Sequence, residues 1–199
     1  EKFIAQCLDC VIRQTFPFTA IDLMVVDGGS NDRTKSIVEK YQKRYSNIRF
    51  IHNPGRIQSI AFNIGVENSD APYIVRLDAH ALYSMDYIEK CIDGLQNDSQ
   101  IGNVGGRCNI LPFNDTLWAK TNAILNYSRF GIGGSAFRVG LKPDYVDSVP
   151  FGAFPRSVVE KIGGMREDLP RAEDNEYNSR LRKAGYKVFF NPAIVSSYY

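Results

Sequence analysis

The sequence predicts a single α/β domain in which helices flank a mainly parallel sheet. Segments with apolar residues at helical spacing alternate with short apolar runs along the 199 residues. The helical segments have the length, about 10 to 15 residues, of the crossovers in βαβ units. The apolar runs end at glycines and small polar residues, as strands do before a turn. Such units build a mostly parallel sheet, and a chain of this length forms one domain by default.

The first half of the chain alternates between helices and strands. Apolar residues between Phe3 and Ile12 recur at helical spacing, and Pro17 closes that helix. The run IDLMVVD, residues 21–27, is a short apolar strand, and GGSND makes a turn that caps the next helix. The elements that follow are helix 34–45, strand 47–52, helix 57–68, strand 73–80, helix 84–96 and strand 101–110.

The second half begins with a helix at 114–129 and a Gly-rich stretch at 130–140. Its glycines make this stretch too flexible for a core element, and we expect it to be a mobile lid. The next helix is opened by a proline and closed by a glycine. The remaining elements are strand 148–154, helix 155–164, helix 173–184 and strand 187–192.

The chain opens directly on a helix. A doubly wound sheet normally begins with a strand, so we expect the first strand to be missing from this chain. That strand would carry part of any nucleotide site.

The composition excludes several classes of protein. With 44% hydrophobic and 23% charged residues it is that of an ordinary folded protein. A net charge of +2, with the basic residues spread along the chain, argues against nucleic acid as a partner. No apolar run approaches the ~18 residues of a membrane-spanning helix. Cys7 and Cys10 form a C-x-x-C, but no second pair follows, so packing explains them better than zinc. A reducing compartment fits these features.

Polar residues stand where the predicted strands end, which is where ligands bind in open α/β sheets. Asp27 lies in VVDGGSNDRT, Arg56 follows FIHNPG, and Asp78 and His80 lie in RLDAHA. On its own, DGGSND is better read as a tight turn with a helix cap. It lacks the G-x-G-x-x-G spacing of a dinucleotide fold and the lysine of a P-loop.

Asp78 and His80 are two residues apart, so both side chains point to one face of an extended segment. A carboxylate and a neutral imidazole suit a divalent cation of the manganese type. The alternative is a histidine held by hydrogen bonds at a strand end. On spacing alone the alternative is favoured, because D-x-H is short and common.

The last helix opens with an acidic cluster, AEDNEYNSR. Glu173 and Glu176 are explained by the helix dipole and by pairing of Glu176 with Arg180 one turn later. The crowding of four polar residues at 173–176, directly after an apolar-to-polar break, is less well explained in this way.

Five stretches in this order resemble the family 2 inverting glycosyltransferases of GT-A fold, and the resemblance extends over essentially the whole chain. The D-A-H form is most similar to the bacterial exopolysaccharide branch that includes the succinoglycan glucosyltransferases. Members of this family carry a strand and an Asn-Glu loop just ahead of the position of Glu1, in agreement with the expected missing strand. The stretches are VVDGGSNDRT, NPGRIQSIAFNIG, RLDAHA, VPFGAFPRSVVEKIGGMREDL and EDNEYNSRLRKAGYKVFFNP.

The resemblance implies transfer of a hexose from a nucleotide-diphosphate donor to an acceptor hydroxyl, with inversion. Asp27 would lie by the nucleotide base, and Gly29 and Ser30 of the same turn would also bind the donor. Arg56 would lie by the base or the phosphates. Many relatives have a second Asp where this chain has Gly28, which leaves the identity of the base open.

The resemblance also implies a metal and a catalytic base. Asp78 would reach the ribose and a bound Mn²⁺ or Mg²⁺. His80 stands where D-x-D members place their last aspartate, and would ligate the metal without adding negative charge. Asp174 matches the family's catalytic base. A metal then stabilises the diphosphate leaving group, so one carboxylate is enough.

Partners and location follow from the same resemblance. The donor would be a UDP-sugar and the acceptor a glycan or lipid-linked glycan, in exopolysaccharide or cell-surface glycan synthesis. The enzyme would work in the cytoplasm at the inner face of the bacterial plasma membrane, with any membrane association through segments outside this chain. Residues 1–110 would bind the nucleotide sugar, and residues 111–199 the acceptor.

A different class of function is a non-catalytic GT-A protein that only binds nucleotide sugars. The intact set of Asp78, His80 and Asp174 speaks against it. A nucleotidyltransferase would need a Gly-rich amino-terminal signature, and a phospho-receiver domain has no place for the second half of this chain.

Overall fold

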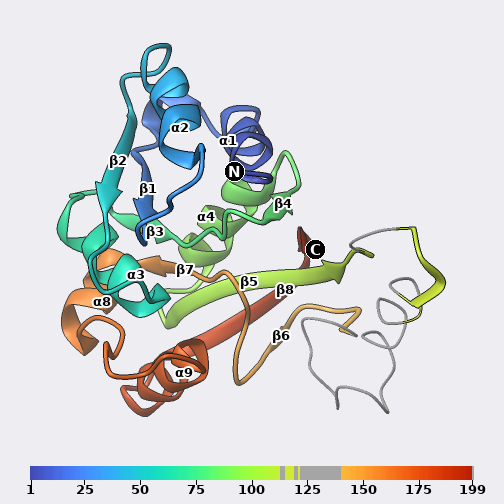
Figure 1. Ribbon diagram of the computed structural model, residues 1–199. Helices are drawn as coiled ribbons and strands as arrows, with labels where there is room; N and C mark the ends of the chain where they lie inside the picture. Colours follow the sequence, from blue (N-terminus) through green and yellow to red (C-terminus); the bar gives the residue numbers. More distant parts are fainter. Residues whose placement is uncertain (113–114, 119–120, 122–139, 199) are drawn as a thin grey trace.

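Figure 1 shows the computed structural model, which describes residues 1–112, 115–118, 121 and 140–198. Most of the predicted helix 114–129 and all of the Gly-rich stretch 130–140 except residue 140 lie outside these residues. In the described part, no helix combines the length and the apolar character that crossing a membrane requires.

A two-stranded parallel sheet forms the amino-terminal part of the fold (Figure 1). The pair is parallel because a helix crosses from the end of one strand to the start of the other. Leu23 stands opposite Ile48 and Asp27 opposite His52, so both strands end at the same edge. The elements are α1 (Ile4–Ile12), η1 (Phe18–Ala20), β1 (Leu23–Asp27), α2 (Thr34–Gln42), β2 (Ile48–His52) and α3 (Gln58–Glu67).

A second sheet of six strands carries most of the remaining chain. Its order is β3-β7-β5-β8-β4, with β6 paired to β8. Its strands are β3 (Tyr73–Val75), β4 (Ala81–Tyr83), β5 (Ile101–Ile110), β6 (Asp144–Tyr145), β7 (Ala153–Pro155) and β8 (Lys187–Tyr198). Its helices are α4 (Tyr87–Asn97), α8 (Arg156–Ile162) and α9 (Glu173–Lys183).

The α/β class is confirmed, but the pairing is mixed rather than mainly parallel. Among the described strands, β1–β2 and β5–β8 are parallel, and the other pairs of the second sheet are antiparallel. A helical crossover fixes parallel pairing only when the strands it joins are neighbours. Here α4 joins β4 to β5, and α8 and α9 join β7 to β8, and neither pair is adjacent.

Two predicted strands have different ends in the structure. The strand predicted to reach residue 80 stops at Val75, because the chain turns after Asp78 and the Ala81 amide donates to the Asp78 carbonyl at 3.1 Å. The last strand continues past Pro192 to Tyr198. In the pairing of β5 with β8, Gly106 stands opposite Asn191 and the next residue, Arg107, stands opposite Val195. Pro192 therefore lies in a bulge of β8 and interrupts no ladder hydrogen bond.

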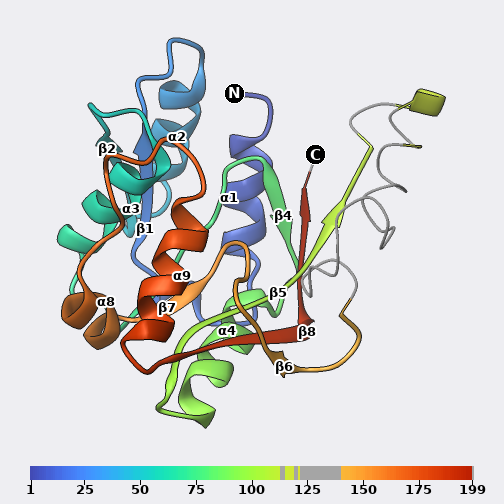
Figure 2. The same ribbon diagram turned by 90° about the horizontal axis from the view of Figure 1, so that it is seen from below.

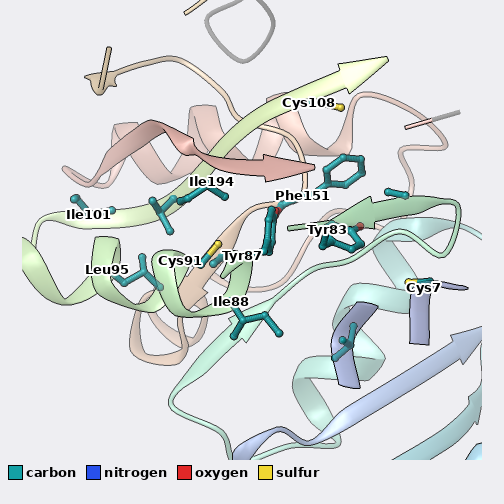
Figure 3. Packing of buried hydrophobic residues seen from close by; sticks show 14 residues of the cluster. Cys7, Tyr83, Tyr87, Ile88, Cys91, Leu95, Ile101, Cys108, Phe151 and Ile194 are labelled. Atoms are coloured by element: carbon teal, nitrogen blue, oxygen red, sulfur yellow. The ribbon is translucent and has the colours of Figure 1, made fainter. Parts of the chain in front are cut away.

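Buried apolar side chains pack the helices against both faces of the second sheet. On one face, the rings of Phe62, Phe154 and Tyr177 contact one another and join α3, β7 and α9. Figures 1 and 2 both show α8 beside α3. The cluster around α4 and β5 in Figure 3 includes Cys7, Cys91 and Cys108 as buried thiols. Burial raises the pKa of Cys7 to about 12, which agrees with a packing role.

A cavity of about 450 Å³ lies between β1 and β3, where the sheet is interrupted. Leu23–Val26 and Tyr73–Arg76 line it, together with apolar side chains of α1, α3 and α4. Among the described strands, β1 pairs only with β2 and β3 only with β7, so each has an unpaired edge. The missing first strand stays a prediction.

Candidate active site

The donor end of the site lies where β1 and β2 end. The Asp27 carboxylate accepts hydrogen bonds from the Gly29 amide at 2.9 Å, the Ser30 amide at 2.8 Å and the Ser30 hydroxyl at 2.5 Å. Burial raises the pKa of Asp27, but the bonds from Ser30 and Gly29 and the nearby His52 outweigh this, so the pKa is lowered overall. The turn reading of DGGSND is therefore correct, and it presents Asp27 as a carboxylate.

Arg56 is brought against this turn. The amide of buried Asn53 donates to the Asp27 carbonyl at 2.7 Å, and the Asn53 side chain accepts from the Arg56 amide at 3.1 Å. Arg56 is exposed and has a left-handed backbone, with φ of 63°. Such strain in a non-glycine residue is typical of functional loops. A Cβ on Gly29 would lie 3.7 Å from Arg56 Nε, so the structure brings the predicted donor residues together.

Arg76 is the centre of the other end of the site. It follows β3, and its side chain is only 10% exposed. Nη1 donates a short hydrogen bond to Asp174 Oδ1. Nη2 donates to Gln58 Oε1 at 3.1 Å and lies 3.4 Å from Glu173 Oε1 and 3.5 Å from Asp78 Oδ1. One guanidinium therefore joins residues of α3, of α9 and of the loop that follows β3.

Asp174 lies in the first turn of α9, after Ala172 with φ of 62°. Its side chain is 34% exposed. Burial raises the pKa of Asp174 to about 6; Arg76 opposes this shift, and Glu173 and Asp78 add to it. A cavity of about 370 Å³ lies in front of the carboxyl, lined by Gln58, residues 148–150 and residues 170–175. Asp174 can thus exchange a proton with a molecule in this cavity.

The other acidic residues of the cluster have different surroundings. Glu176 pairs with Arg180 through two contacts of 3.1 Å, as predicted. Glu173 does more than serve the helix, because it is 9% exposed and faces Arg76. Of the two carboxyls beside Arg76 on α9, Asp174 is the accessible one.

Asp78 and His80 do not share one face of an extended segment, because the chain turns between them. Asp78 faces Arg76 and Gln58, whereas the His80 ring packs on Tyr198 with a centroid distance of 4.5 Å. In the part of the chain that the structure describes, no three His, Cys, Asp or Glu side chains gather as a metal site.

The chemistry around Asp78 nevertheless fits a divalent cation. Cations of nucleotide enzymes are held by one or two protein ligands and by substrate phosphates, so a closed protein cage is not required. The three carboxylates of Asp78, Glu173 and Asp174 around the single cation of Arg76 leave a local charge of about −2 when all are ionised. A bound divalent cation would balance this charge.

Arg76 and Gln58 are absent from the predicted site. Arg76 carried a usable signal, since it stands inside the apolar run YIVRL. A charged side chain in a buried strand must find a partner of opposite charge. The identity of that partner depends on α9, 98 residues further along the chain.

Comparison with known proteins gives consistent results. Residues 1–163 match the family model described as Glycosyl transferase family 2. The chain is 29% identical over 206 aligned residues to a dolichyl N-acetyl-alpha-D-glucosaminyl phosphate 3-beta-D-2,3-diacetamido-2,3-dideoxy-beta-D-glucuronosyltransferase of Methanococcus voltae, covering 100% of this chain and 63% of that protein. It is 30% identical over 180 residues to the succinoglycan biosynthesis protein ExoA of Rhizobium meliloti (strain 1021), covering 89% and 53%.

Among solved structures, the chain resembles the mannosyltransferase PcManGT from Pyrobaculum calidifontis in complex with GDP-Man and Mn²⁺. The TM-score is 0.74 at 21% identity, covering 98% of this chain and 52% of that one. This similarity shows a shared fold. The chain spans between 52% and 63% of the length of these three proteins.

Proposed function

Because the chain belongs to glycosyl transferase family 2 and has the GT-A fold, we propose that it transfers a sugar from a nucleotide-diphosphate donor to an acceptor hydroxyl with inversion. The observation that carries the proposal is the position of Asp174. This half-buried carboxyl has a pKa of about 6, faces a cavity and shares Arg76 with the donor-side Asp78. A base of this kind is what the attack of a hydroxyl requires.

The base acts on the acceptor. As the acceptor oxygen attacks the anomeric carbon from the side opposite the leaving group, its proton passes to Asp174. The reaction centre has oxocarbenium character, as in glycoside hydrolysis. Since Arg76 occupies Oδ1, we assign the proton to Oδ2.

The donor would be held at the ends of β1 and β2. Asp27, Gly29 and Ser30 form the turn that receives the nucleoside, and exposed Arg56 offers a cation to the base or phosphates. Asp78 and His80 would hold Mn²⁺ or Mg²⁺, which supplies Lewis-acid stabilisation of the diphosphate leaving group when bound. The PcManGT complex contains Mn²⁺, which supports a divalent cation as the cofactor.

The substrates are proposed from the family and its relatives. We favour a UDP-sugar as the donor. We favour a glycan or lipid-linked glycan as the acceptor, in exopolysaccharide or cell-surface glycan synthesis at the inner face of the bacterial plasma membrane. Residues 1–110 would hold the donor and residues 111–199 the acceptor. Because Gly28 replaces a base-contacting Asp of many relatives, GDP-sugars belong in the same screen.

The test is a screen of UDP- and GDP-sugars with Mn²⁺, in which nucleotide release and product formation are followed with a panel of glycan and lipid-linked acceptors. We expect one donor to be consumed, and Asp174→Asn to abolish most of that consumption. A donor that binds but is neither hydrolysed nor transferred with any acceptor would favour the non-catalytic alternative.

A further inference from the structure

Arg76 has a rigid position at the boundary between the two ends of the site. Its main-chain amide donates to the Gly152 carbonyl at 3.1 Å, beside β7, and its side chain is 10% exposed. Burial of a guanidinium is unfavourable unless it is paired and hydrogen-bonded. The ion pairs and hydrogen bonds of Arg76 therefore fix the position of its guanidinium.

Those partners come from both sides of the proposed reaction. Nη1 binds Asp174 on the acceptor side. Nη2 contacts Asp78 at 3.5 Å on the donor side, and its bond to Gln58 at 3.1 Å adds α3, which begins two residues after Arg56. The planar fork of an arginine can hold two groups at fixed angles, which a lysine ammonium cannot do.

We propose that Arg76 is a positioning residue of the transfer reaction, which sets the Asp174 carboxylate relative to Asp78 by holding Oδ1 and directing Oδ2 to the acceptor. This inference rests on the proposed function. In the described part of the chain, Arg76 is the hydrogen-bond donor to Asp174. A carboxylate without this bond can rotate about χ2, and misplacement of a catalytic group by about 1 Å can cost a factor of about 100 in rate.

A competing role is direct binding of the donor diphosphate by Arg76. The surroundings argue against it, because the side chain is 10% exposed and both Nη atoms are occupied. Exposed Arg56 at the donor end is the freer cation. The two roles differ in kinetics: a positioning residue changes kcat, whereas a phosphate ligand changes donor affinity.

The experiment is a double-mutant cycle between Arg76→Gln and Asp174→Asn. In the wild-type background, we expect Arg76→Gln to lower kcat by about 100-fold, with donor KM and the Kd of UDP changed less than about threefold. In the Asp174→Asn background the same change should cost little more, because Arg76 acts through Asp174. Arg76→Lys should restore only a small part of kcat. Arg49→Gln, which removes an exposed ion pair to Asp22, is the matched control and should match the wild type.

The outcomes separate the two proposals. A wild-type chain without transfer or hydrolysis on any donor contradicts the proposed function itself. An active wild type in which Arg76→Gln costs equally in both backgrounds, or mainly weakens UDP binding, overturns the positioning role. If Arg76→Gln does not fold, the cycle is repeated with Glu173→Gln present in every variant, and Glu173→Gln alone is the reference. The loss of the Arg76 cation then leaves one fewer carboxylate unpaired.

Discussion

The carboxyl of Asp174 has a raised pKa because it is half-buried among like charges, and this gives a defined pH dependence. The base works when ionised, so kcat/KM should be constant above pH 7 and fall as the pH drops through about 6, because kcat/KM reports the pKa values of the free enzyme. An Asp with the ordinary pKa of about 3.9 would keep about half of its activity at pH 4. At pH 5 we expect about a tenth of the maximal kcat/KM. A pH profile of kcat/KM measures this, and a profile flat to pH 4.5 would remove Asp174 from the rate-limiting proton transfer.

The same pKa shift means that ionised Asp174 lowers the stability of the native state at neutral pH. Its folded pKa lies above the unfolded value, so the native state prefers the protonated form, and stability should rise as the pH falls from about 6 toward 4. Asp174→Asn should therefore raise the urea midpoint near pH 7 and lose this advantage near pH 4, while transfer falls by about 10² to 10⁴. Glu176→Gln is the control, since Glu176 pairs with Arg180 outside the site. A less stable Asp174→Asn at pH 7 would contradict the assigned environment.

The metal assignment depends on His80, which packs on Tyr198 instead of beside Asp78. We expect UDP to bind more tightly with Mn²⁺ than in EDTA, and His80→Ala to remove most of that gain without weakening binding in EDTA. Tyr198→Leu removes the ring contact but leaves the imidazole, so it separates packing from ligation. Calorimetry that finds equal UDP affinity with and without Mn²⁺ would exclude the metal role.

Single residues differ in how far the sequence predicts them. Asp27 and Arg56 were expected at strand ends, and their turns meet because β1 and β2 are parallel and in register. The partners of Arg76 could not be predicted, because Asp174 lies 98 residues away and depends on how α9 packs on α3. The prediction that Asp78 and His80 share one face was wrong, because side chains alternate with period two only while a strand continues.

Helices and strands were predicted well where one local signal decided them. The glycine and proline at the ends of α8 and the apolar stripe of α1 are local features, and both helices lie where predicted. The short strands β4 and β6 were missed, because they exist only through pairing with β8. Pro192 predicted the end of a strand that in fact continues, because the proline falls at a register shift.

The register shift between β5 and β8 leaves no room for a side chain at position 106 of β5. A Cβ on Gly106 would lie 2.0 Å from the Ile194 carbonyl oxygen, which is main chain and cannot turn away. Gly106→Ala should thus destabilise the fold by at least the ~1–3 kcal/mol of an overpacked core. Gly65→Ala is the matched control, because nothing lies within 4 Å of its Cβ position in α3. The control should be stabilised by about 0.5–1 kcal/mol. Urea unfolding measures both, and equal effects would contradict the close approach.

The two sheets of the fold are separated by the cavity between β1 and β3. Both facing edges are unpaired among the described strands, and apolar side chains of α1, α3 and α4 line the gap, so main-chain groups along these edges have no strand partner.

Filling this gap should join the two sheets into one. We predict that a five-residue apolar, β-branched segment fused ahead of Glu1 by a short linker will pair with β1 and β3 and raise the free energy of unfolding by about 2 kcal/mol or more. Urea unfolding measures the gain, and hydrogen exchange should slow at amides of both strands. The control carries the same segment with a central proline, which cannot complete the pairing. Equal stability of the two fusions, with no added protection in β1 or β3, would show that the cavity does not accept a strand.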